Sequence, residues 1–123
     1  MNRAHRLALY ASFTLLAASG VAAELAPAWR TALMQVHGAA AMVALLAIGG
    51  LLVQHVTKGW AERRNRWTGM LVLAGALWLA VTGYVLYYSG SDELRAFAGS
   101  AHLWIGIALS VALGLHIRRA ALT

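Results

Sequence analysis

The apolar residues of this chain fall into four long stretches, separated by short segments that hold nearly all of the charge. The stretches cover residues 7–27, 32–57, 67–88 and 100–117. Each is close to the roughly 20 residues that a helix needs to cross a lipid bilayer. The pattern predicts four transmembrane helices joined by short loops, an all-α integral membrane four-helix bundle that forms a single domain over residues 1–123.

The composition supports a membrane protein and excludes several kinds of metal centre. With 61% hydrophobic and only 11% charged residues, the 123-residue chain is too apolar for a soluble domain of this size. It contains no cysteine, so it cannot form disulfides, thiolate zinc sites, iron–sulfur clusters or covalently attached c-type haem. The basic residues behind the net charge of +6 flank the apolar stretches, so we expect the lipid surface as their partner and no nucleic acid.

The amino terminus is similar to a cleavable signal peptide, with a basic start, an apolar middle and small residues at its end. Its sequence is MNRAHRLALYASFTLLAASGVAA. We expect it to be retained as the first helix, which would end near Pro27. Arg3 and Arg6 would then hold the start of this helix in the cytoplasm.

The distribution of basic residues predicts the orientation in the membrane. One side of the predicted helices holds eight of them: Arg3, Arg6, Lys58, Arg63, Arg64, Arg66, Arg118 and Arg119. The other side holds Arg30 and Arg95. Because basic loops stay on the inner side, both termini are predicted to be cytoplasmic, and the protein is predicted to be a multi-pass protein of the cell inner membrane.

Four histidines occupy the ends of two of the predicted helices. His37 and His55 are 18 residues apart on the second helix, and His102 and His116 are 14 residues apart on the fourth. These separations are close to whole numbers of helical turns, so the two imidazoles of each pair share a helix face, roughly 27 Å and roughly 21 Å apart respectively.

The predicted topology brings these histidines together in two pairs. The second and fourth helices run in the same direction, so His37 matches the depth of His102 near the outer surface, and His55 matches His116 near the inner one. Two neutral imidazoles facing each other suit a haem iron, whose porphyrin is compatible with the surrounding apolar side chains. A bis-histidine iron has no open position, which favours single-electron transfer over substrate binding. The sequence therefore predicts two b haems.

Two of these segments resemble the ligand helices of a known family. SAHLWIGIALSVALGLHIRR is similar to a ligand helix of the membrane cytochrome b type of four-helix bundle, and HGAAAMVALLAIGGLLVQH is similar but less close. In that family two histidines on each of two helices hold two b haems stacked across the membrane, with near-equal spacings of thirteen or fourteen. The resemblance covers nearly the whole chain in architecture and is closest to small diheme subunits. The spacing of eighteen on the second helix departs from the family pattern.

The expected partners follow from this assignment. Haem propionates need cationic groups near the membrane surfaces, and the candidates are Arg95 on the outer side and Arg63 or Arg64 on the inner side. Resemblance implies quinol or quinone as a membrane-soluble partner, with an outer-side redox protein as a further candidate. We expect an electron-transfer protein, as a homo-oligomer or as a subunit of an oxidoreductase complex, rather than a self-contained enzyme.

Other interpretations stay open at this stage. Histidines in membrane helices also form hydrogen bonds between helices, and we assign His5 to that class. Four short helices with a carboxylate, Glu24, on the first of them are similar to the small multidrug transporters. Glu24 lies at the outer end of its helix, however, and not near the midplane, where a substrate-binding acid is expected. A cofactor-free assembly subunit is the third possibility. Gly69, Gly75 and Gly83 on the third predicted helix are expected to serve close helix packing more than cofactor clearance.

Overall fold

The structure is a computed structural model that describes residues 3–52, 56–62 and 66–122. Four long helices dominate it: α1 (Arg3–Leu25), α2 (Arg30–Leu51), α4 (Arg66–Tyr88) and α5 (Asp92–Leu122). A short helix α3 (Thr57–Ala61) lies within the segment predicted as a loop, and the 3₁₀ turn η1 (Pro27–Trp29) precedes α2. The prediction of an all-α chain is confirmed for the described residues, which contain no strand.

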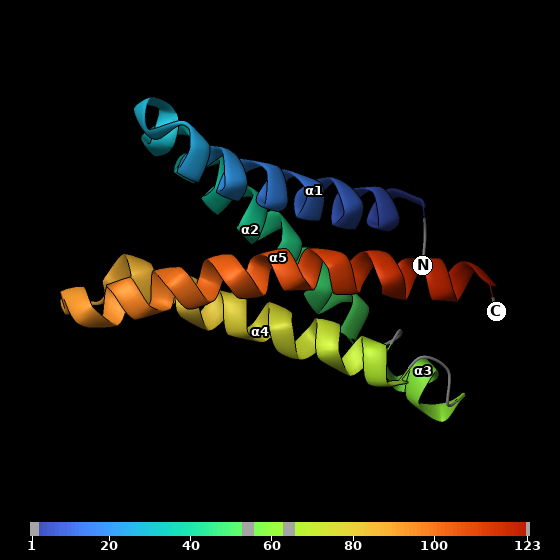
Figure 1. Ribbon diagram of the computed structural model, residues 1–123. Helices are drawn as coiled ribbons and strands as arrows, with labels where there is room; N and C mark the ends of the chain where they lie inside the picture. Colours follow the sequence, from blue (N-terminus) through green and yellow to red (C-terminus); the bar gives the residue numbers. More distant parts are fainter. Residues whose placement is uncertain (1–2, 53–55, 63–65, 123) are drawn as a thin grey trace. The chain divides into compact units, whose positions relative to one another are not determined.

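The long helices form two antiparallel hairpins (Figure 1). The first hairpin, within residues 1–63, pairs α1 with α2 through Ala26 and η1. Pro27 opens that 3₁₀ turn, where its missing N–H costs no hydrogen bond. The second hairpin, within residues 64–123, pairs α4 with α5 through residues 89–91. We call the end of each hairpin at which its two helices are joined the connection end.

Helix α5 begins eight residues before the predicted start at position 100. Ser91 caps it, because the backbone N–H of Leu94 donates to Ser91 Oγ over 3.2 Å. Asp92 and Glu93 follow in the first turn, where carboxylates interact favourably with the positive end of the helix dipole. The prediction of a loop between the apolar stretches 67–88 and 100–117 was wrong from Asp92 onward, because charge was taken as a loop signal. Arg95 is consequently a helical residue.

Helix α2 is shorter than predicted as a regular α-helix. The prediction ran to position 57, whereas the α-helix ends at Leu51, and the backbone at Leu52 and Val56 is π-helical. The predicted alignment of His37 with His55 assumed 3.6 residues per turn throughout. That assumption holds only as far as Leu51, and His55 lies outside the described residues.

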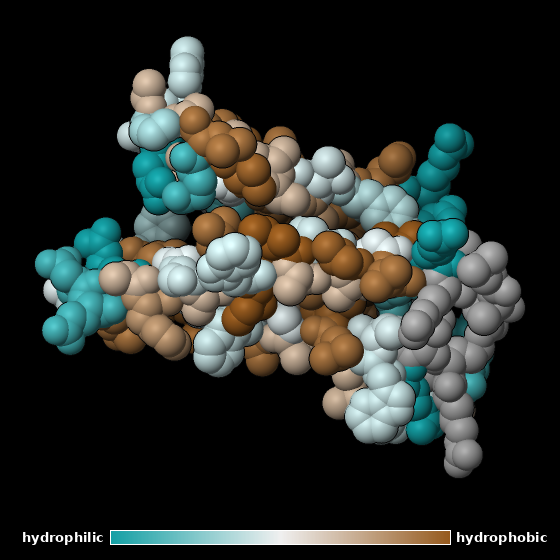
Figure 2. All heavy atoms as spheres, viewed as in Figure 1, coloured by the Kyte–Doolittle hydropathy of each residue, from teal (hydrophilic) through white to brown (hydrophobic). Residues whose placement is uncertain are grey.

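The surfaces of both hairpins are those of lipid-facing helices. All four long helices are long and apolar enough to cross a membrane. Large apolar side chains of α2 and α4 are exposed: Leu46 is 78% exposed, and Leu71 and Leu77 are each 66% exposed. On the visible face of the α4–α5 hairpin, apolar residues cover the middle and hydrophilic residues gather at the connection end (Figure 2). The fold is consistent with a multi-pass membrane protein.

Small residues line the contact between α1 and α2. The buried ones are Ser12, Ser19 and Ala23 on α1 and Ala40, Ala44 and Ala47 on α2. Their spacings of three, four and seven residues form one stripe on each helix. Without a hydrophobic effect between helices in lipid, such stripes favour association by letting the backbones approach.

In the second hairpin, Gly75 of α4 packs against Leu109 of α5. A Cβ atom at Gly75 would lie 2.9 Å from Leu109 Cδ1. We expect Gly75→Ala to lower the unfolding temperature in detergent, because Leu109 is buried and has little room to shift, and overpacking at about 1–3 kcal/mol matches or exceeds the gain of about 1 kcal/mol in helix propensity. The matched control is Gly114→Ala, since a Cβ there meets nothing within 4 Å. Equal thermal stability of the two variants would contradict this packing.

Candidate haem-ligand histidines

His37 projects from α2 towards α1, two turns into its helix. Its Nδ1 atom lies 3.0 Å from the hydroxyl oxygen of Ser19. The next residue along α1 is Gly20, and a Cβ at that position would lie 3.4 Å from His37 Cε1. The imidazole therefore packs on Ser19 and Gly20 of the neighbouring helix, at a distance where a Cβ at Gly20 would make ordinary van der Waals contact with the ring.

His102 has the same surroundings in the second hairpin. Its Nδ1 atom lies 2.8 Å from Thr82 Oγ1 on α4. Gly83 follows Thr82, and a Cβ there would lie 3.6 Å from His102 Cε1. Thr82 is buried. Each hairpin thus holds one imidazole against a hydroxyl and a glycine of its other helix.

The direction of these hydrogen bonds determines which imidazole nitrogen carries the proton. Ser19 Oγ already donates its single hydrogen to the backbone of its own helix, at 2.6 Å from the carbonyl oxygen of Leu15. Thr82 Oγ1 likewise donates to the carbonyl oxygen of Trp78 at 2.9 Å. Each hydroxyl oxygen can then only accept from Nδ1–H. With the bonds in this direction, the proton lies on Nδ1 of His37 and His102, and Nε2 of the neutral ring carries the lone pair through which an imidazole ligates iron.

His116, the second predicted ligand on α5, repeats the contact. Its Nδ1 lies 3.0 Å from Thr68 Oγ1, and a Cβ at Gly69 would lie 3.7 Å from His116 Cε1. Gly69 and Gly83 therefore adjoin imidazoles, whereas Gly75 has the helix-packing role predicted for all three. The remaining predicted site residues, His55, Arg63 and Arg64, lie outside the described residues.

His5 forms its hydrogen bond through Nε2, whereas His37, His102 and His116 form theirs through Nδ1. Its Nε2–H donates to the carbonyl oxygen of Ala47 on α2 over 2.7 Å, so the predicted role as a helix-to-helix hydrogen-bonding group is confirmed. The ring lies against Gly50, where a Cβ would approach His5 Cε1 to 2.7 Å. The α1–α2 hairpin accordingly holds an imidazole at the depth of Gly50, far from its connection end.

The two hairpins share one sequence pattern. The steps Ser19–Gly20 and Thr82–Gly83 each begin sixteen residues after an arginine, Arg3 or Arg66. On the returning helix an arginine precedes the histidine by seven residues, in RTALMQVH and again in RAFAGSAH. Comparing the two halves of the chain would have revealed these hydroxyl–glycine steps, but an analysis that starts from histidine spacing misses them because they bear no charge.

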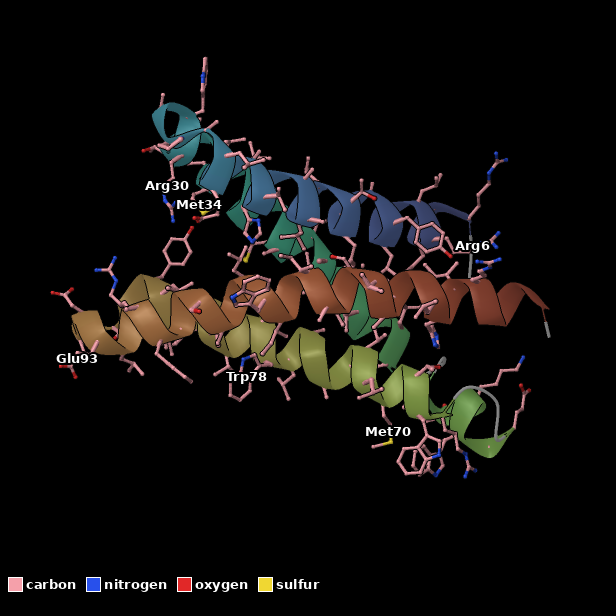
Figure 3. The ribbon with its side chains drawn as sticks, in the orientation of Figure 1. Arg6, Arg30, Met34, Met70, Trp78 and Glu93 are labelled. Carbon is pink, nitrogen blue, oxygen red and sulfur yellow. The ribbon has the colours of Figure 1, made fainter. Side chains whose placement is uncertain are left out.

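The paired arginines lie at the connection ends. Seven residues are just under two helical turns, so Arg95 shares a face of α5 with His102, and Arg30 shares a face of α2 with His37, about 10 Å from the histidine. Arg95 is exposed. Arg30 lies at the connection end of its hairpin and Arg6 at the other (Figure 3), and Arg30 forms a 2.9 Å ion pair with Glu24. Glu24 is thus an exposed ion-paired carboxylate at the helix end.

Comparisons with known proteins identify no family for this chain. No protein-family model, curated protein or solved structure matches the chain. Within the part of the chain that the structure describes, no three histidine or acidic side chains gather as a metal site. A bis-histidine iron needs only two protein ligands, so the relevant features are the single imidazoles at Ser19–Gly20, Thr82–Gly83 and Thr68–Gly69.

Proposed function

We propose that the protein is a diheme b-type cytochrome of the cell inner membrane, which carries electrons across the bilayer. One observation supports this most strongly. His37 and His102 occupy equivalent positions in two similarly built hairpins, and each bonds through Nδ1 to a hydroxyl that already donates elsewhere. With the proton on Nδ1, both imidazoles would offer Nε2 to an iron, and we assign them as the two ligands of the outer haem.

A haem iron held between two imidazoles supplies reversible one-electron chemistry. The chain contributes the ligands, their orientation and an apolar environment. Ser19 and Thr82 hydrogen-bond to the two rings, and Gly20 and Gly83 adjoin them. Ligation by two imidazoles would leave no open position on the iron, which suits a carrier between a quinol pool or cytoplasmic-side donor and an outer-side redox partner.

The second haem requires His116 and an imidazole from the α1–α2 hairpin. His55 is the ligand expected from the family resemblance, and His5 is a second candidate that the geometry supports. The ring of His5 lies at Gly50, thirteen residues after His37 on α2, or about 20 Å along the helix axis. His116 lies fourteen residues after His102, or about 21 Å. Because these two axial distances are nearly equal, His5 is the favoured ligand. Its Nε2 atom would bind the iron in place of its hydrogen bond to the carbonyl oxygen of Ala47.

Charged residues fit the same arrangement. Arg95 and Arg30 are positioned about two turns beyond the outer ligands, where they can bind haem propionates. To bind a propionate, Arg30 must leave or share its exposed ion pair with Glu24. Such a pair contributes only about 0–1 kcal/mol to stability, so the exchange costs little. Arg63 and Arg64 are the inner candidates. The eight-to-two distribution of basic residues supports cytoplasmic termini.

The competing functions have less support. A drug transporter needs an acidic side chain near the midplane, and Glu24 is an exposed residue at a helix end, paired with Arg30. A cofactor-free subunit has no need for histidines at equivalent positions with a common tautomer. Hydrogen bonds between helices are also expected of a cofactor-free subunit, so the repetition of the contact at His37, His102 and His116 is what favours a shared ligand role.

Electron transfer across vesicles tests this function. The full chain is reconstituted into liposomes that contain ferricyanide, and dithionite is added outside. We expect ferricyanide reduction well above the rate of protein-free vesicles, and a return to that background in vesicles with the His102→Ala variant. Haem-loaded wild-type vesicles that react no faster than empty ones would refute transmembrane electron transfer.

A further inference from the structure

Each of the three hydroxyl groups opposite His37, His102 and His116 makes a contact that the histidine spacing does not explain. Ser19, Thr82 and Thr68 lie on α1 and α4, across from the helices that carry His37, His102 and His116, and each is within 3.0 Å of an imidazole Nδ1. Each is followed by a glycine. A serine or threonine in a membrane helix ordinarily satisfies itself by donating to its own backbone. Each of these three side chains also contacts the Nδ1 atom of a histidine on the neighbouring helix.

We propose that Ser19, Thr82 and Thr68 are positioning residues that fix the tautomer of the haem-ligating histidines and set the reduction potentials of the two haems. The inference rests on the proposed cytochrome function. Each hydroxyl accepts Nδ1–H and so raises the electron density at Nε2. Because a neutral hydroxyl is a weaker acceptor than a carboxylate, the imidazole keeps its neutral character and the ferric state is stabilised only moderately.

The orientation of two of these hydroxyls, those of Ser19 and Thr82, is fixed by their own helices. Thr82 Oγ1 lies 2.9 Å from the carbonyl oxygen of Trp78 and 3.2 Å from that of Leu79. Ser19 Oγ makes the matching contacts with Leu15 and Leu16, at 2.6 Å and 3.3 Å. With the single proton held by these carbonyls, the oxygen lone pair faces the imidazole. The ring is held without any ionised group inside the apolar span, where a charge would be costly.

The pairing of ligands gives the proposal a specific pattern. Ser19 and Thr82 contact the two ligands assigned to the outer haem, whereas Thr68 contacts a ligand of the inner haem. Removing either Ser19 or Thr82 must therefore affect the same haem. Removing Thr68 must affect the other.

A redox titration of the full haem-loaded protein tests the proposal. Thr82→Val removes the hydroxyl at nearly constant volume, and the loss of one acceptor favours the ferrous state. We expect the ferrous-to-ferric ratio of one haem to rise about fivefold at fixed ambient potential, the equivalent of one hydrogen bond. Ser19→Ala should shift the same haem and Thr68→Val the other one. Thr82→Ser, which keeps the hydroxyl, should titrate as wild type.

The control is Ser110→Ala. Ser110 Oγ donates to the carbonyl oxygen of Gly106 over 2.9 Å on α5, so it matches the backbone contact of Thr82. A shift in Ser110→Ala as large as in Thr82→Val, or unchanged titration and ligand-field spectra in the two hydroxyl-deleting variants at Thr82 and Ser19, would overturn the proposal while leaving the cytochrome function intact.

Nitrogen-15 NMR of the histidine rings separates this inference from the proposed function. In the full chain prepared without haem, we expect His37 and His102 to be protonated at Nδ1 and His5 at Nε2. Thr82→Val should give a mixture of tautomers at His102 alone. Protonation of His37 and His102 at Nε2 in the wild type would overturn the positioning role. Absence of haem from a chain purified from haem-replete cells would instead refute the function, and the positioning role with it.

Discussion

His102→Ala is expected to reduce the haem content of the purified protein from two per chain to one. His102 is a proposed axial ligand, and its loss leaves His37 alone at that site, which is insufficient to retain a b haem that has no covalent attachment. The ratio of haem to protein, from the pyridine haemochrome spectrum and amino-acid analysis, measures the effect. The remaining haem should keep its own reduction potential.

Combining substitutions sharpens this test. If His37 and His102 share one iron, then His37→Ala, His102→Ala and the double variant all retain one haem per chain, because the second substitution removes nothing further. If the two histidines bound separate haems, the double variant would retain none. Ser110→Ala, on the same helix as His102, should retain two. A haem-free double variant beside one-haem single variants would contradict the shared outer site.

The second large effect distinguishes the two candidates for the inner ligand. We expect His5→Ala to lower the haem content to one per chain and His55→Ala to leave it at two, because the His5 ring lies at Gly50, at a depth that matches the spacing of His102 and His116. The His5/His116 double variant should also retain one haem. The same haem-to-protein ratio provides the measurement, with the retained haem identified by its potential.

The opposite outcome is equally definite. Two haems per chain in His5→Ala and one in His55→Ala would identify His55 as the ligand of the inner haem, as the family resemblance implies. Gly50→Ala provides an independent check, since a Cβ there would meet His5 Cε1 at 2.7 Å and must displace the ring. A perturbed inner-haem spectrum is expected in this variant. An unchanged spectrum would argue against His5.

The apolar pattern was sufficient to predict the four long helices, because a span across lipid needs about 20 apolar residues and little else. It failed at the start of α5, where Asp92 and Glu93 form a first helical turn although their charge suggested a loop. The end of α2 was also mispredicted, since a residue count cannot reveal that the α-helical period stops at Leu51. Local backbone geometry of this kind leaves no trace in hydropathy.

The candidate site was only partly predictable. His37, His102 and His116 were found by their spacing, which the helical period makes informative. Their partners Ser19, Thr82 and Thr68 were not, because a neutral hydroxyl within an apolar helix gives no signal until the neighbouring helix is known. The role of His5 as a possible ligand depends on its contact with Gly50, which is 45 residues away in the sequence. Such contacts arise from helix pairing and not from local sequence.

The haem content of the full-length wild-type protein, purified from haem-replete cells, tests the central claim most directly. A diheme cytochrome is expected to be a coloured protein whose reduced-minus-oxidised spectrum has a b-type α band and whose haem-to-protein ratio is two per chain. A colourless protein that is folded and helical in detergent would contradict haem binding.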